Sequence, residues 1–347
     1  MDMQEHAIEF NIVYHINPYP AALRKDLDEI AQVCDGVYIP VTEAMLLEAP
    51  NVIRRAVDFA QEVDLVVMFA LSGFGNILGG GRHASIFTAS HPEYNCITSN
   101  GRAIPMSCPN KPAVRSYFQW VVEDLMTKYG PAGLLAYLPS WSLPSHFGSL
   151  EPGETPCRCA DCKAAYRGWA SGDMPDHDTP ETASFRAQTM AALLDCFSSA
   201  IKSRGDHLIA SVCLAPNDSL EFKKALASVR DLDAFGVTAY WRPNSDITQR
   251  EYISRHVGEA VGIARESGKL AEAWICAFDQ DARHESDAAH AARLCADMDV
   301  DILSTWSYRD YQSGAPLDKP SAGDPELVWQ NLRRAYHELR EGKEEEA

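Results

Sequence analysis

Eight short apolar segments recur along the 347-residue chain, and each is followed by a longer segment whose apolar residues return every three or four positions. The short segments are apolar almost throughout, as expected for parallel strands that are covered on both faces. They are residues 8–16, 35–41, 64–71, 133–138, 207–215, 233–241, 270–278 and 301–308. The helical segments are residues 21–34, 49–63, 111–130, 182–205, 218–232, 250–268, 286–298 and 324–342. Eight successive strand–helix units predict an α/β fold, a closed (β/α)₈ TIM barrel, with a doubly wound open sheet as the alternative.

Two connections are too long for plain strand-to-helix loops. Residues 72–108 follow the third strand, and residues 139–180 follow the fourth. Both leave the carboxyl ends of strands, where barrels of this kind carry their active sites. Long ordered loops in a compact domain usually serve a function. We therefore predict one barrel domain over residues 1–341 that includes both insertions, and a disordered tail at 342–347.

The formal net charge is −18, and acidic residues are spread along the whole chain. Such a surface repels nucleic-acid phosphates and anionic lipids, so neither a nucleic acid nor a membrane is expected as a partner. The N-terminal residues show no basic region followed by an apolar run, and no apolar stretch is long enough to span a bilayer. We predict a cytoplasmic protein with reduced thiols. Whether it forms homo-oligomers stays open.

Four of the ten cysteines form a pattern across the two insertions. Cys108 ends the first insertion, and the second contains C-x-C-x-x-C, which is Cys157, Cys159 and Cys162. Four thiolates suit tetrahedral Zn²⁺, and a complete set of protein ligands leaves no position for a reactive water. The pattern therefore predicts a structural zinc site that joins the insertions. The alternatives are four unligated thiols or a redox C-x-x-C pair, although no short thioredoxin-like βαβ frame surrounds the motif.

This cysteine pattern resembles the zinc cluster of the family 42 β-galactosidases, which are retaining glycoside hydrolases on a (β/α)₈ barrel. The sequence around it, over roughly residues 105–170, also resembles a wider group of uncharacterised glycosidase-like barrels, in which a Cys-Pro-Asn-Pro-like stretch opens the helix before strand four. The resemblance implies a barrel that acts on a small glycoside or oligosaccharide and whose zinc is structural.

Aromatic residues collect where the predicted strands end, and a ring face can stack on the C–H face of a sugar while its N–H or O–H binds a hydroxyl group. The aromatic candidates for substrate binding are Tyr14, Trp141, Trp241, Trp274 and Trp306, with Tyr137, Tyr240 and Tyr308 nearby. The polar candidates are Asn17, His83 and Arg242. The alternative is that the rings only cap the core of the barrel.

Glu272 is the most distinctive candidate for catalysis because it interrupts an apolar strand, where a charge needs a partner or a function. The alternative is a buried ion pair with Arg242 or Arg309. The other catalytic candidates are Asp279, Asp310 and Glu43 as carboxylates, and His15 as a proton carrier. Asn217 and Asp218 follow the fifth strand.

The chain departs from the resembling family at the end of strand four. There the family has its acid/base glutamate after an asparagine, whereas this chain reads AYLPSW over residues 136–141, without an acid. The nucleophile of strand seven maps only loosely, to Glu272 or Asp279. Retaining glycosidases need two carboxyl groups about 5 Å apart. Three hypotheses remain: a glycoside hydrolase whose carboxylates come from other strands, a carbohydrate lyase or isomerase, or a sugar-binding barrel without catalysis.

Overall fold

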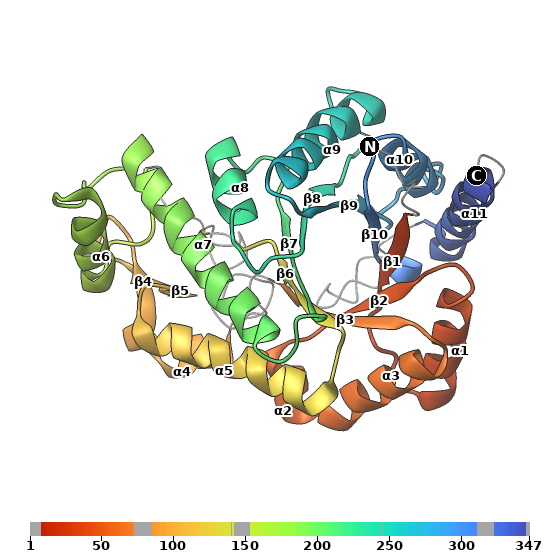
Figure 1. Cartoon of the computed structure of the whole chain (residues 1–347), viewed down its shortest axis with the longest axis horizontal. Helices are drawn as coiled ribbons and strands as arrows, with labels where there is room; N and C mark the ends of the chain where they lie inside the picture. The colour runs from red at the N-terminus through yellow and green to blue at the C-terminus, as the bar shows by residue number, and fades with distance from the viewer. Residues whose placement is uncertain are drawn as a thin grey trace.

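The computed structural model describes residues 8–72, 85–139, 141, 153–243, 245–310 and 323–344. Eight parallel strands close into a barrel in the order β1-β10-β9-β8-β7-β6-β3-β2 (Figure 1). They are β1 (Glu9–Val13), β2 (Gly36–Pro40), β3 (Val66–Ser72), β6 (Gly133–Tyr137), β7 (Ile209–Leu214), β8 (Ala234–Ala239), β9 (Leu270–Cys276) and β10 (Ile302–Trp306). Every predicted strand is present, and the first pairs with the last. The closed barrel is therefore confirmed and the open sheet is excluded.

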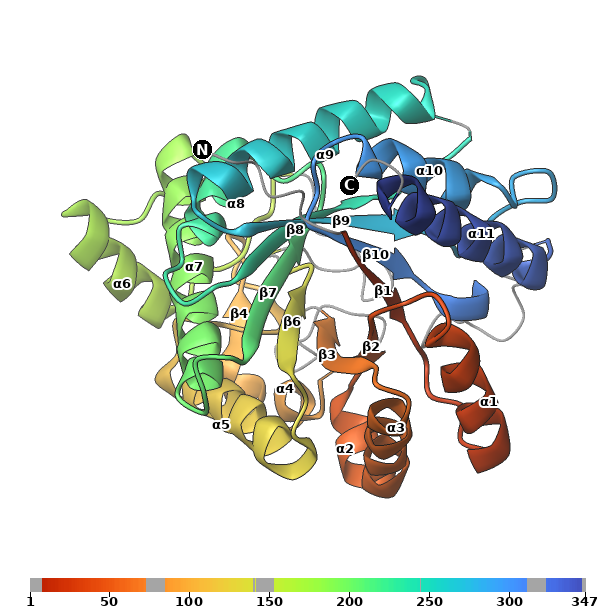
Figure 2. The same ribbon diagram turned by 45° about the vertical axis from the view of Figure 1, so that its right-hand side comes forward.

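Helices surround the strands on the outside of the barrel (Figure 2). They are α1 (Pro20–Ile30), α2 (Glu43–Glu48), α3 (Pro50–Glu62), α5 (Pro112–Tyr129), α7 (Pro180–Lys202), α8 (Leu220–Ala227), α9 (Gln249–Glu266), α10 (Asp287–Ala296) and α11 (Pro325–Glu344). Proline at the first position starts α1, α3, α5 and α7, since its missing N–H is not needed there. Thr248 and Glu251 form a capping box at the start of α9. The last helix runs to Glu344, into the predicted tail, and 345–347 lie outside the described residues.

The two insertions contribute secondary structure that the apolar pattern did not predict. The first contains α4 (Ile86–Ser90), the short turn Pro92–Tyr94, and an antiparallel pair, β4 (Asn95–Ile97) with β5 (Ala103–Ser107). The second contains α6 (Ala160–Ala170). Figure 1 places β4, β5 and α6 on the same side of the barrel. We call these three elements, with Cys108 and the segment 153–159, the insertion module.

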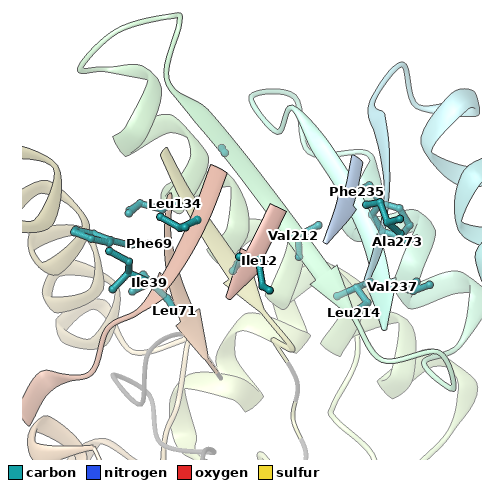
Figure 3. Close-up of a cluster of buried hydrophobic side chains, with 14 of the residues drawn as sticks. Ile12, Ile39, Phe69, Leu71, Leu134, Val212, Leu214, Phe235, Val237 and Ala273 are labelled. Atoms are coloured by element: carbon teal, nitrogen blue, oxygen red, sulfur yellow. The ribbon is translucent and has the colours of Figure 1, made fainter. Parts of the chain in front are cut away.

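The strands bury both of their faces, as their continuous apolar runs predict. Outward side chains such as Ile12, Ile39 and Phe69 pack against the helices (Figure 3). Inward side chains such as Val13 and Tyr38 fill the lumen. The insertion module has a separate apolar cluster, whose members include Ile104 and the four predicted ligand cysteines. Within the described ranges, no helix is both long enough and apolar enough to cross a bilayer.

Candidate functional site

The four predicted ligand cysteines lie together in the insertion module. Their sulfur atoms all lie within 4.8 Å of one another, and all four side chains are buried. Cys108 Sγ is 3.3 Å from Cys162 Sγ and 3.6 Å from Cys159 Sγ. Zinc–sulfur bonds of about 2.3 Å in a tetrahedron place neighbouring sulfurs about 3.8 Å apart, so one metal ion fits between these groups.

Local structure and N–H donors prepare these sulfurs for a metal. Cys108 directly follows β5, and Cys159 is the N-cap of α6, whose sulfur accepts from the Cys162 N–H at 3.4 Å. The Ile97 N–H donates to Cys157 Sγ at 3.3 Å, and Asn110 Nδ2 donates to Cys162 Sγ at 3.3 Å. Such donors stabilise thiolates and orient metal ligands.

Glu272 lies deep in the barrel lumen, not at its mouth. It is the third residue of β9, on the amino-terminal side of Trp274, and it is 1% exposed. Its Oε1 accepts from Tyr38 Oη at 3.0 Å and from Ser304 Oγ at 2.6 Å. Burial raises the pKa of this carboxyl to about 7, against the lowering effect of its hydrogen bonds.

Trp274 lies two residues closer to the mouth on the same face of β9 and is itself fully buried, so a ligand at the mouth would meet this ring before Glu272. The alternative ion pair does not form either. Arg242 donates to the Phe278 and Asp279 carbonyls, and Arg309 pairs with Glu29. The catalytic role of Glu272 stays a prediction, but its position favours a structural or positioning role.

The Glu43 carboxylate is also engaged in hydrogen bonds within the fold. It begins α2, yet its carboxylate reaches the start of α4, where it accepts from Ile86 N at 2.5 Å and Ser85 Oγ at 3.2 Å. Tyr117 Oη of α5 donates to the same carboxylate at 2.8 Å. The side chain is 5% exposed, so Glu43 joins three helices and is poorly placed to act on a ligand.

The remaining acidic candidates differ in position. Asp279 directly follows the β9 region, and its carboxylate lies 3.6 Å from Arg242 with 65% of its side chain exposed. Asp218, which the sequence placed after strand five without assigning a role, accepts from Ala215 N at 2.9 Å, and burial raises its pKa. The side chain of Asp310 and the whole of His83 lie outside the described residues.

Three of the predicted aromatic and polar binders make their contacts outside the lumen cluster. Tyr14 packs into the outer core, where its hydroxyl donates to Asp26 at 3.0 Å. Asn17 Oδ1 accepts from Tyr19 N at 3.1 Å and so shapes the turn before α1. Trp141 donates to the Arg186 carbonyl at 3.1 Å and packs between the barrel core and the cluster of the insertion module. Their roles in binding stay predictions.

Trp241 and Arg242 follow β8 at the mouth. Trp241 Nε1 donates to the Ile247 carbonyl at 2.9 Å, and the side chain is half-buried. The Arg242 guanidinium lies 5.1 Å from the centre of the Phe278 ring. Both can therefore line the rim of a site.

The lumen below the rim is aromatic. Trp306, at the end of β10, lies 4.4 Å from the Tyr137 ring in a stacked arrangement and 5.8 Å from the His15 ring. Tyr137 in turn lies 5.6 Å from the Trp274 ring. Burial lowers the pKa of His15 to about 4, so its imidazole is neutral at pH 7. The sequence placed these rings at strand ends, and the closed barrel brings them together.

Solved glycoside hydrolases have similar structures. A β-galactosidase from the haloarchaeon Halorubrum lacusprofundi matches with a TM-score of 0.71 at 12% identity, over 96% of this chain and 58% of the other. The β-galactosidase of Bacillus circulans sp. alkalophilus matches with a TM-score of 0.70 at 12% identity, over 97% and 56%. An endo-1,4-β-mannanase from Rhizomucor miehei gives 0.64 at 9% identity, over 98% and 97%.

These likenesses show the fold: the chain is a glycoside hydrolase-like (β/α)₈ barrel. The fold implied by the cysteine pattern is thus confirmed. The chain spans little more than half the length of the two β-galactosidases, so their activity does not transfer with the fold. No family model and no curated protein sequence matches this chain.

Proposed function

We propose that this chain is a carbohydrate-active enzyme that binds a small glycoside at the mouth of the barrel and hydrolyses it. The observation that carries the proposal is the aromatic lumen, in which Trp306, Tyr137 and His15 gather at strand ends of a glycoside hydrolase-like barrel. Barrels carry their chemistry at this end, and apolar ring faces with a few polar groups suit a sugar.

Hydrolysis requires two carboxyl groups. Asp218 is the better proton donor, because burial raises its pKa and so favours the protonated form. Asp279 is the better second carboxylate, because its side chain is exposed at the end of β9 beside Arg242. A retaining or an inverting outcome depends on the distance between them.

A sugar-binding barrel without catalysis is the second candidate. One reason is that β6, the fourth barrel strand, ends in the uncharged residue Tyr137. The other is that the carboxyl groups of Glu43 and Glu272 are engaged in structural hydrogen bonds. A lyase or isomerase would use His15, whose neutral imidazole can accept a proton.

The metal in this proposal is one structural Zn²⁺ held by Cys108, Cys157, Cys159 and Cys162. Four thiolates complete a tetrahedral shell and keep water out of it, so the ion takes no part in the reaction. A cytoplasmic location, the absence of nucleic-acid and membrane partners, and the state of self-association stay predictions.

The test uses the purified protein with a panel of methyl and p-nitrophenyl glycosides, and Asp218→Asn and Asp279→Asn variants. For the methyl glycosides, whose leaving group needs a proton, removal of the general acid in Asp218→Asn or of the second carboxylate in Asp279→Asn should each lower kcat by about 10²-fold or more, while sugar affinity changes little. Sugar binding without turnover of any glycoside would favour the second candidate. If calorimetry detects no binding of any sugar or glycoside, both candidates are wrong.

A further inference from the structure

Two tyrosine hydroxyl groups meet inside the lumen, at the strand end where the resembling family has its acid. Tyr137 is the last residue of β6, and Tyr240 follows the last residue of β8. Both belong to the lumen cluster, on strands separated by β7. Their oxygen atoms lie 2.6 Å apart, which is a short hydrogen bond.

One of the two hydroxyl protons of the pair does not take part in the hydrogen bond between the tyrosines. Two neutral hydroxyl groups carry two protons, but only one can lie between the two oxygens. Within the described ranges, each hydroxyl has the other as its hydrogen-bond partner. The second proton and the remaining lone pairs can therefore serve another hydroxyl group, which both donates and accepts.

The two hydroxyl groups themselves and the nearby imidazole of His15 carry no ionic charge at neutral pH. Burial raises the pKa of both tyrosines well above the ordinary value, and the nearby His15 is neutral. The Tyr137 ring is fixed between Trp306 and Trp274, and the Tyr240 ring meets Phe278 edge-on at 5.4 Å. Rigid rings therefore hold two uncharged hydroxyls in a fixed place. The Nε2 atom of His15 is buried without a protein partner in the described ranges, so a further polar group near Trp306 is free for a ligand.

We propose that the Tyr137–Tyr240 hydroxyl pair is a sugar-binding site that takes one hydroxyl group of a neutral saccharide, in the position where the resembling family has a carboxyl group. This inference rests on the proposed function and specifies its substrate class. A carboxylate on the ligand, as in a uronic acid, would lose its hydration at this pair, because neither tyrosine hydroxyl nor the neutral His15 supplies a positive charge.

The experiment measures affinity by calorimetry at pH 7. The probes are the methyl glycosides of galactose, glucose and mannose, their single-deoxy analogues, and the methyl glycoside of galacturonic acid. Tyr137→Phe and Tyr240→Phe should each raise the Kd of the best neutral sugar about tenfold. The double variant should cost little more than either single one, because the pair acts as a unit.

Tyr308→Phe is the matched control, since this hydroxyl contacts Glu29 at 3.2 Å in the outer core. It should leave the Kd unchanged. One deoxy sugar should bind the wild type about tenfold more weakly and should lose nothing further in Tyr137→Phe. If a variant does not fold, the scan on the wild type can still overturn the inference, because a site without any sensitive sugar hydroxyl does not fit it.

The outcomes separate the two proposals. If the wild type binds no sugar, the proposed function and this inference both fall. If a neutral sugar binds but the Tyr→Phe variants bind it equally well, or no single sugar hydroxyl matters, only this inference is overturned. Tighter binding of the galacturonate glycoside than of every neutral probe would also overturn it.

Discussion

The insertion module and the barrel mouth differ in where their residues come from along the chain. The four cysteines of the module come from the two insertions, and their sulfurs lie within 4.8 Å of one another. The mouth draws its residues from the ends of separate strands, and several of its expected members point elsewhere, including Tyr14 and Glu43. A metal site is specified by ligand type and spacing, whereas a lumen depends on the face and depth of every side chain. The two regions should therefore respond differently to substitution.

Loss of the metal should have the largest effect, and it should stay in the module. Cys162→Ser removes one of four ligands, and a structural zinc contributes on the order of 10 kcal/mol to folding of the segments that bind it. We expect the metal content to fall from one ion per chain to none. Hydrogen exchange should speed up in β4, β5 and α6 while the barrel strands keep their protection. Cys196→Ser, in the half-buried part of α7, is the control. If hydrogen exchange in Cys162→Ser speeds up as much in the barrel strands as in the module, the two regions do not respond differently and the prediction is wrong.

Glu272 should make the barrel less stable as the pH rises. Its folded-state pKa is about 7, above the ordinary value of 4.5, so the folded state holds the proton more tightly. Its contribution to stability is complete below pH 4.5 and is lost as the pH rises through 7. A shift of this size corresponds to about 3 kcal/mol.

Glu272→Gln should remove this pH dependence, and urea unfolding at pH 5 and pH 8 measures it. At pH 8 the variant should be the more stable protein. Glu266→Gln, at a side chain that is 66% exposed on α9, is the control. If wild type and Glu272→Gln show the same pH slope, the carboxyl does not titrate in this range.

Substitution of Glu43 should have the smallest effect. Glu43→Gln keeps one acceptor oxygen but weakens the contacts to the start of α4 and to Tyr117, which should cost about 1 kcal/mol. Hydrogen exchange should rise over residues 85–90, and turnover of any confirmed substrate should persist. Glu48→Gln, exposed on the same helix, is the control. If Glu43→Gln keeps its stability and its slow hydrogen exchange but loses activity, Glu43 has a catalytic role and the structural interpretation is wrong.

The sequence predicted the barrel because each strand is an uninterrupted apolar run, and both faces of such a strand are buried. It predicted the cysteine cluster because ligand type and spacing are visible in one dimension. It did not predict the β4–β5 pair, whose strands are short, or α6, whose buried face includes Cys162 of the cysteine cluster. From the sequence we expected Glu272 near a ligand at the mouth, whereas it lies deep in the lumen. A position within a strand does not by itself show which end of the lumen the side chain reaches.

The sequence showed Asp218, Tyr137 and Tyr240 at the ends of predicted strands, but it did not show the burial of Asp218 or the hydrogen bond between the tyrosines. Asp218 looked like an ordinary loop start, and its raised pKa comes from burial that only the fold creates. Tyr137 and Tyr240 are 103 positions apart, and only closure of the barrel brings their oxygens to 2.6 Å.

Trp141 packs against both the barrel core and the cluster of the insertion module. Trp141 is thus one of the side chains through which the packing of the two regions is joined, as is Phe185 of α7. If an ion in the module and a ligand at the mouth both change the packing of Trp141, each must change the affinity for the other by the same factor. An ion that does no chemistry would then tune how tightly the barrel holds a ligand, even where the fold of the barrel strands is unchanged.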